Sequence, residues 1–131
     1  MFDASQIVAH LVGDYVIQSD WMAIEKTKQS WAALIHALVY TIPFLFITQS
    51  IQALIWIAGL HFIIDRWRLA RYVCWAKNFL APKRYWHPWA ECSGTGYHKD
   101  RPPWMSVWLM IIADNTMHLI TNGLAIAYYV S

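Results

Sequence analysis

The stretch that decides the fold is HFIIDRWRLARY, residues 61–72. An apolar run precedes it, and His61 and Asp65 stand four residues apart, so both side chains share one face of a helix. Basic residues follow at once, beginning with Arg66. We predict a helix that carries a buried His–Asp pair on its apolar part and continues as a basic, amphipathic segment along a membrane interface.

The same spacing recurs in two other apolar segments. His10 precedes Asp14 by four residues in AHLVGD, and Asp114 precedes His118 by four residues in ADNTMH. A further apolar segment contributes His36 alone. Ionisable side chains are costly in apolar helices, so several of them at matching places indicate a shared site. We therefore predict that these side chains gather into one buried cluster.

The composition favours an integral membrane protein. Hydrophobic residues make up 58% and charged residues 14% of the 131 residues, against roughly 45–50% and 25% in an ordinary soluble domain. We predict an all-α, integral membrane four-helix bundle that forms a single domain over residues 1–131. The predicted spans are residues 5–21, 31–49, 53–72 and 104–130, with a proline-rich loop at 81–103.

The basic residues predict the topology. They fall in two blocks, 26–28 and 66–101, which lie in alternate connections. They do not form one stripe, so nucleic-acid binding is not expected. Because basic loops mark the cytoplasmic side, we predict a multi-pass protein with cytoplasmic basic loops and both termini on the outer side.

The cluster is best interpreted as a metal site. Imidazoles and carboxylates without a nearby thiolate suit Zn²⁺, with Mn, Fe or Ni as alternatives, and helical bundles hold such ions in their cores. Seven candidates exceed what one four-coordinate ion needs, so either the site is dinuclear or some Asp residues orient His rings. The candidate ligands are His10, Asp14, His36, His61, Asp65, Asp114 and His118.

A metal site of this kind predicts hydrolysis. A bound metal lowers the pKa of its water toward about 7 and creates a nucleophile, and the depth of the cluster suggests a lipid or lipid-linked substrate. Asp14 or Asp65 would serve as the general base. Gln18, Arg66 and Arg68 are the candidate substrate-binding residues, because Arg recognises phosphate with paired hydrogen bonds.

Other interpretations of the same residues stay open. The His and Asp side chains could hydrogen-bond across helices as structural contacts alone, or form a path for protons or ions. The protein could also be a non-enzymatic accessory factor that binds a host membrane protein. Four helices enclose little volume, so a homo-oligomer is also expected. In the loop, the spacing of His87, Glu91 and His98 matches no standard metal pattern.

Four blocks of the sequence together carry a family resemblance: AHLVGDYVIQSDWMA, LIHALVY, HFIIDRWRLARY and ADNTMHLITN. They resemble the domain-of-unknown-function 3307 family, which implies a small integral membrane protein of bacteria or phages. With the predicted topology, this resemblance implies a bacterial inner membrane protein with both termini periplasmic. The proline-rich loop resembles the phage-type members. The pattern is also distantly similar to membrane-bound metal-dependent hydrolases, which implies metal-dependent chemistry. The resemblance implies that the His and Asp residues above, with Gln18 and Asp20, occupy motif positions.

Overall fold

The computed structural model describes residues 2–130, and all regular structure within that range is helical. The prediction of an all-α fold is confirmed. The chain divides into two compact units. The first unit joins the residues up to Trp67 to those from His118 onward, and the second unit is Arg68–Met117. The long helix α7 (Pro103–Val130) contributes its beginning to the second unit and its end to the first.

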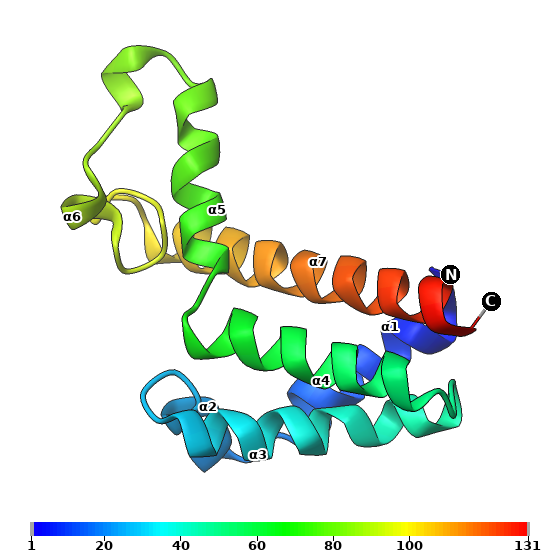
Figure 1. The fold of residues 1–131 in the computed structure, drawn as a ribbon. Helices are drawn as coiled ribbons and strands as arrows, with labels where there is room; N and C mark the ends of the chain where they lie inside the picture. The colour runs from blue at the N-terminus through cyan, green and yellow to red at the C-terminus, as the bar shows by residue number, and fades with distance from the viewer. Residues whose placement is uncertain (1, 131) are drawn as a thin grey trace. The chain divides into compact units, whose positions relative to one another are not determined.

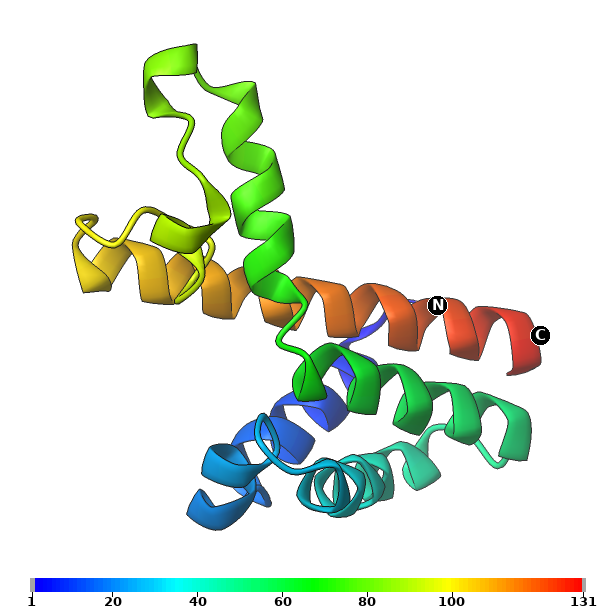
Figure 2. The same ribbon diagram turned by 60° about the vertical axis from the view of Figure 1, so that its left-hand side comes forward.

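The first unit is built on an antiparallel pair of helices. α3 and α4 run side by side in both views (Figures 1 and 2), and they share more contacts than any other two elements. A 3-10 turn, η2, links them. The other elements of this unit are α1, the π-helical turn η1, α2 and the end of α7. The bounds are α1 (Ala4–Leu11), η1 (Val12–Val16), α2 (Asp20–Glu25), α3 (Ser30–Thr41), η2 (Ile42–Phe46) and α4 (Ile51–Arg66).

Short polar side chains begin three of these helices. The Asp3 carboxylate accepts a hydrogen bond from the Gln6 amide, and the hydroxyls of Ser19 and Ser50 cap α2 and α4 in the same way. Each cap satisfies an amide that the first helical turn leaves without a partner. The predicted first helix, residues 5–21, is therefore divided into α1, η1 and α2.

The first unit buries polar side chains and exposes large apolar ones. His10, His36, His61 and His118 are fully or almost fully buried, whereas Phe46 is 91% exposed. Apolar residues usually fill protein interiors, and here Tyr40, Phe44 and Ile57 form an apolar cluster in addition to the buried histidines. Polar contacts consequently organise much of the interior of this unit.

The second unit holds the remaining elements, which are α5 (Ala70–Lys77), η3 (Asn78–Leu80), η4 (Lys83–Tyr85), α6 (Trp89–Cys92) and the beginning of α7. Aromatic and cationic side chains pack it together. The Tyr72 and Trp89 rings stack with centroids 4.5 Å apart, and the Arg71 guanidinium lies over both rings. Cys74 and Cys92 are buried and free.

The predicted continuous helix beyond residue 66 is interrupted. α4 ends at Arg66, and Arg68 has a φ of 50°, which is uncommon for a residue with a side chain. The Arg68 guanidinium donates to the carbonyl oxygen of Gly94 over 2.7 Å. Because this backbone conformation cannot continue a right-handed helix, α5 starts as a separate helix at Ala70.

The predicted membrane topology is wrong. Among residues 2–130, no helix combines the length and the apolar character required to cross a bilayer. α3 has 12 residues and α4 has 16, against about 20 for a span. α7 has 28 residues, but Asp114 and His118 are among the polar residues that interrupt it. The inner-membrane location, the periplasmic termini and the cytoplasmic loops were inferred from these spans, so they are withdrawn.

Candidate metal centre

Four buried side chains of the first unit converge from three elements. Asp14 comes from η1, His36 from α3, and His61 and Asp65 from successive turns of α4. Each of them offers one nitrogen or oxygen to a common group of atoms within 4.8 Å of one another. Of the seven predicted ligands, the structure brings these four together in one group.

The four atoms are His36 Nε2, His61 Nε2, Asp14 Oδ1 and Asp65 Oδ2. The two nitrogens lie 2.9 Å apart. His36 Nε2 is 3.1 Å from Asp14 Oδ1 and 3.2 Å from Asp65 Oδ2. His61 Nε2 is 3.4 Å and 3.1 Å from the same two oxygens. A tetrahedral ion with bonds of about 2.0–2.2 Å would separate its ligand atoms by about 3.3–3.6 Å, so the donor set fits such an ion after small adjustments.

Lys26 brings a cation to the same group. Its Nζ lies 2.7 Å from Asp65 Oδ2 and 3.4 Å from His36 Nε2. The contact with Asp65 is an ion pair. Its geometry is not that of a hydrogen bond, since Asp65 Oδ2 has no hydrogen-bond partner among the described residues. The Lys26 side chain keeps 16% of its surface exposed, whereas Asp65 keeps 4%. The ammonium thus approaches the buried carboxylate from the more exposed side.

The pKa values in the cluster are set by burial and by these contacts. Burial alone would raise the pKa of Asp14, but hydrogen bonds with His36 and His61 hold it far below its ordinary value. The pKa of Asp65 is likewise held well below its ordinary range by His61, His118 and His36 despite burial. Burial alone would lower the pKa of His36, and its close contacts with the Asp14 and Asp65 carboxylates raise it above its ordinary value. Both carboxylates are therefore ionised at neutral pH, as metal ligands must be.

Tyr40 fixes the imidazole of His61. The two rings stack at 14° with centroids 3.6 Å apart, and the Tyr40 hydroxyl accepts a hydrogen bond from Asn122 Nδ2 over 2.6 Å. The same hydroxyl lies 2.8 Å from His10 Nδ1. The outer nitrogens of His36 and His61, Nδ1 in both, have no hydrogen-bond partner among residues 2–130. Ring packing therefore orients these imidazoles where a hydrogen bond usually does so.

Gly13 allows Asp14 to reach the cluster. A Cβ at position 13 would lie 2.5 Å from Tyr40 Cδ2 and 3.1 Å from the Tyr40 carbonyl oxygen, so only glycine fits this approach of η1 to α3. The Ile17 amide bonds to the Val12 carbonyl five residues back. Such π-helical turns are frequent at functional sites, and this one carries Asp14.

The remaining predicted ligands lie around the four-atom group or apart from it. His118 Nε2 is 3.1 Å from Asp65 Oδ1, the oxygen that faces away from His36 and His61. His10 Nδ1 is 3.6 Å from Asp14 Oδ2. Both can orient a carboxylate without belonging to the group itself. Asp114 falls in the second unit, so its role as a ligand stays a prediction.

The predicted substrate-binding residues have structural partners. Gln18 donates to the backbone carbonyl of Asp14 over 2.9 Å. Arg66 donates to the Thr27 carbonyl and to the Ser30 hydroxyl, which ties α4 to the connection before α3. Arg68 lies in the second unit and donates to Gly94. Their roles in substrate binding stay predictions.

Sequence reasoning missed Lys26 and Tyr40. Lys26 was interpreted only as part of a basic block in a connection, and nothing local indicates that its side chain turns inward. Tyr40 gave a signal, since it follows His36 by four residues and so shares its helix face.

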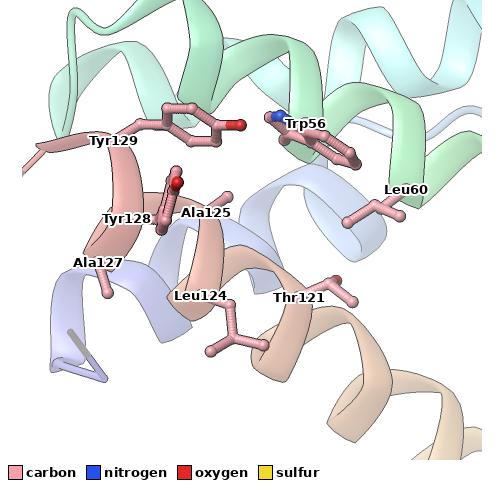
Figure 3. Close-up of a pocket in the computed structure, with 8 residues that line it drawn as sticks. All are labelled: Trp56, Leu60, Thr121, Leu124, Ala125, Ala127, Tyr128 and Tyr129. Atoms are coloured by element: carbon pink, nitrogen blue, oxygen red, sulfur yellow. The ribbon is translucent and has the colours of Figure 1, made fainter.

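The first unit also has an apolar pocket that is separate from the His and Asp cluster. Residues of α4 and α7 enclose a cavity of about 450 Å³, where the Trp56 and Tyr129 rings stack with centroids 6.5 Å apart (Figure 3). Leu60, Leu124 and Ala125 contribute to an almost wholly apolar wall. None of the four clustered residues lines it, and it offers no titratable group suited to bond cleavage.

Fold and cluster together define a class: a small all-α protein with buried His and Asp side chains arranged around one point. Within that class, the chain belongs to the family described as "Protein of unknown function (DUF3307)", whose sequence profile matches residues 4–130. The family assignment made from the sequence blocks is confirmed. The chain matches no curated protein and no solved structure.

Proposed function

We propose that the protein is a metal-dependent hydrolase whose ion is bound by Asp14, His36, His61 and Asp65. One observation carries the proposal. Five separations among the four donor atoms fall between 2.9 and 3.4 Å, close to the edges of a tetrahedron around a first-row divalent ion. Two nitrogens and two oxygens without a thiolate favour Zn²⁺, with Mn, Fe or Ni as alternatives.

The charges of the cluster support the same proposal. Two buried carboxylates need positive charge beside them, and burying an uncompensated charge is costly. Lys26 provides one such charge at 2.7 Å from Asp65, and a proton on His36 would provide the second. A divalent ion would supply compensation in place of that proton, because a ligating imidazole must be neutral.

Because the four side chains fill a tetrahedral shell, a reacting water would have to bind at a fifth coordination position. A divalent ion held there would act as a Lewis acid and lower the pKa of that water. The chain would contribute the acid–base groups. Asp14 is our candidate for the proton acceptor, since its Oδ2 stands outside the donor group and lies 3.6 Å from His10 Nδ1. Asp65 has both oxygens against His side chains, which suits it to hold the ion.

The substrate is proposed only as an ester or phosphoester. A lipid substrate was expected because the cluster was placed inside a bilayer, and that reason is lost without a spanning helix. The accessory-factor and ion-path interpretations were framed for the same membrane location. Purely structural contacts between His and Asp remain the competing interpretation of the cluster.

The test is elemental analysis of the purified full chain, combined with assays on p-nitrophenyl esters and phosphates. We expect stoichiometric metal and metal-dependent hydrolysis in the wild type. Both should be absent from a His61→Ala/Asp65→Ala double variant and retained by Lys28→Met, whose side chain is 61% exposed. A folded wild type that takes up no first-row ion would overturn the metal centre. Stoichiometric metal without hydrolysis of either class would overturn the hydrolase and leave a structural ion.

A further inference from the structure

The second unit contains its own group of three candidate ligands. His98 Nε2 lies 3.0 Å from Glu91 Oε2, and His87 Nδ1 lies 3.8 Å from the same oxygen. The two imidazole rings have centroids 4.2 Å apart. One donor atom from each residue lies within 4.8 Å of the others. The two oxygen–nitrogen distances bracket the separation of about 3.3–3.6 Å expected between ligands of a tetrahedral ion.

Backbone hydrogen bonds position these three side chains before any ion binds. Trp75 Nε1 donates to the carbonyl of His87 over 3.0 Å, which holds the segment before α6. The Lys99 amide donates to the carbonyl of Glu91 over 2.9 Å, which holds the residue after His98 beside α6. Preformed ligand positions lower the entropy that ion binding must overcome.

Gly96 lies in the turn that brings the chain from the end of α6 back to His98. Its φ is +90°, and a Cβ there would collide with the carbonyl oxygen of Arg71. A residue with a side chain would therefore disturb this turn. The ligand spacing departs from standard motifs because the return runs through this turn, so the sequence alone did not predict the group.

The surroundings suit an ion with one open position. His98 Nδ1 accepts a hydrogen bond from the Asp100 amide over 3.2 Å. A metal on Nε2 would place the ring proton on Nδ1, and the Asp100 carboxylate, whose Oδ2 lies 3.6 Å away, could then accept it. A cavity of about 170 Å³ lies beside the group, and His87, His98 and Arg101 contribute to its wall. It has room for a water or a small anion. The buried Cys92 thiol is not among the grouped donor atoms.

We propose that His87, Glu91 and His98 form a second divalent-metal site, with Zn²⁺ as the best-fitting ion and its fourth position open toward this cavity. Two imidazoles, one carboxylate and one exchangeable ligand form a recurrent zinc set. The bound ion would fasten the segment between α5 and α7. This site is independent of the centre in the first unit.

The experiment is calorimetric titration of the chelator-treated full chain with Zn²⁺. We expect two equivalents in the wild type and one in His87→Ala/His98→Ala. The His61→Ala/Asp65→Ala variant should also bind one, at the loop. Glu91→Gln keeps the side-chain shape and should lose the same equivalent of Zn²⁺ as the double His variant. It therefore tests the site even if His87→Ala/His98→Ala does not fold. Asp100→Asn should weaken that equivalent by about 10–100-fold.

The outcomes separate the two sites. One Zn²⁺ in the wild type that Glu91→Gln abolishes would support the loop site even if the first centre fails. Folded His87→Ala/His98→Ala and Glu91→Gln variants that bind as much Zn²⁺ as the wild type would overturn it. So would a wild type whose only Zn²⁺ is lost in His61→Ala/Asp65→Ala.

Discussion

The two units hold their titratable side chains in opposite ways. In the first unit, Asp14 and Asp65 expose 7% and 4% of their side chains, and the His rings beside them are fully enclosed. In the second unit, Glu91 exposes 42% of its side chain and His87 exposes 27%. Removing one partner of a buried ion pair lowers the folding stability strongly, whereas an exposed ion pair contributes little to that stability. The same residue types should therefore be essential to the fold of the first unit and nearly neutral in the second.

The largest expected effect is on stability. Asp65→Ala leaves Lys26, His36 and His61 without their shared carboxylate, and the free energy of unfolding should fall by about 3–5 kcal/mol. Glu91→Gln in the second unit should cost less than about 1 kcal/mol. Urea denaturation of metal-free protein measures both. Equal costs for the two variants would break the contrast between buried and exposed clusters.

A substitution at Lys26 tests whether the first cluster favours a cation. Lys26→Met removes a positive charge 2.7 Å from a donor atom, so Zn²⁺ affinity of the first centre should rise by at least about tenfold, because like charges so close repel strongly. Lys28→Met is the matched control, since Lys28 is 61% exposed on its side chain and pairs only loosely with Glu25. Unchanged affinity in Lys26→Met would mean that the ammonium does not compete with an ion.

Substitutions at two glycines of the first unit test how much close packing contributes to its stability. Gly13→Ala should destabilise by about 1–3 kcal/mol, because its Cβ would overlap Tyr40. Gly59→Ala on α4 meets no atom within 4 Å, and it should stabilise by up to about 1 kcal/mol through helix propensity. Thermal unfolding of both variants checks the sign. A neutral Gly13→Ala would contradict the close approach of η1 to α3.

The smallest expected effect is the pH dependence of the metal-free chain. The lowered pKa values of Asp14 and Asp65 give stability that is present above the ordinary value of 3.8 and lost as pH falls further. The raised pKa of His36 gives stability that is present below 6.5 and lost as pH rises through its folded value. Metal-free protein should therefore be most stable between these limits. Zn²⁺ should restore stability at higher pH, where the His36 imidazole has lost its proton. Urea midpoints measured across the pH range check this, and a flat profile would contradict it.

The local part of the site could be predicted from the sequence. His61 and Asp65 lie four residues apart on one helix, so their common face follows from helix geometry alone. His36 and Asp14 were included because ionisable groups in apolar segments must meet partners. The side chain of Lys26 could not be foreseen, because its direction depends on how the turn between α2 and α3 folds against α4.

The fold was predictable only in class. Apolar periodicity gave helices, but their ends depend on single residues such as Arg68, whose positive φ divides the predicted long helix without a glycine to mark it. Three of the predicted spans failed because their apolar segments fold into shorter helices than the unbroken sequence suggests. The fourth, α7, is long enough, but polar residues interrupt its apolar character. The His87, Glu91 and His98 group was missed because the Gly96 turn, and no regular helix, brings it together.

The most direct test of the metal centre is X-ray absorption at the zinc edge on the loaded full chain. The His87→Ala/His98→Ala background removes the loop ion from the signal. The geometry in the first unit predicts two nitrogens and two oxygens at about 2.0–2.2 Å and no sulfur. A spectrum that contains sulfur, or a six-oxygen shell of a hydrated ion, would contradict the assignment of Asp14, His36, His61 and Asp65 as the ligands.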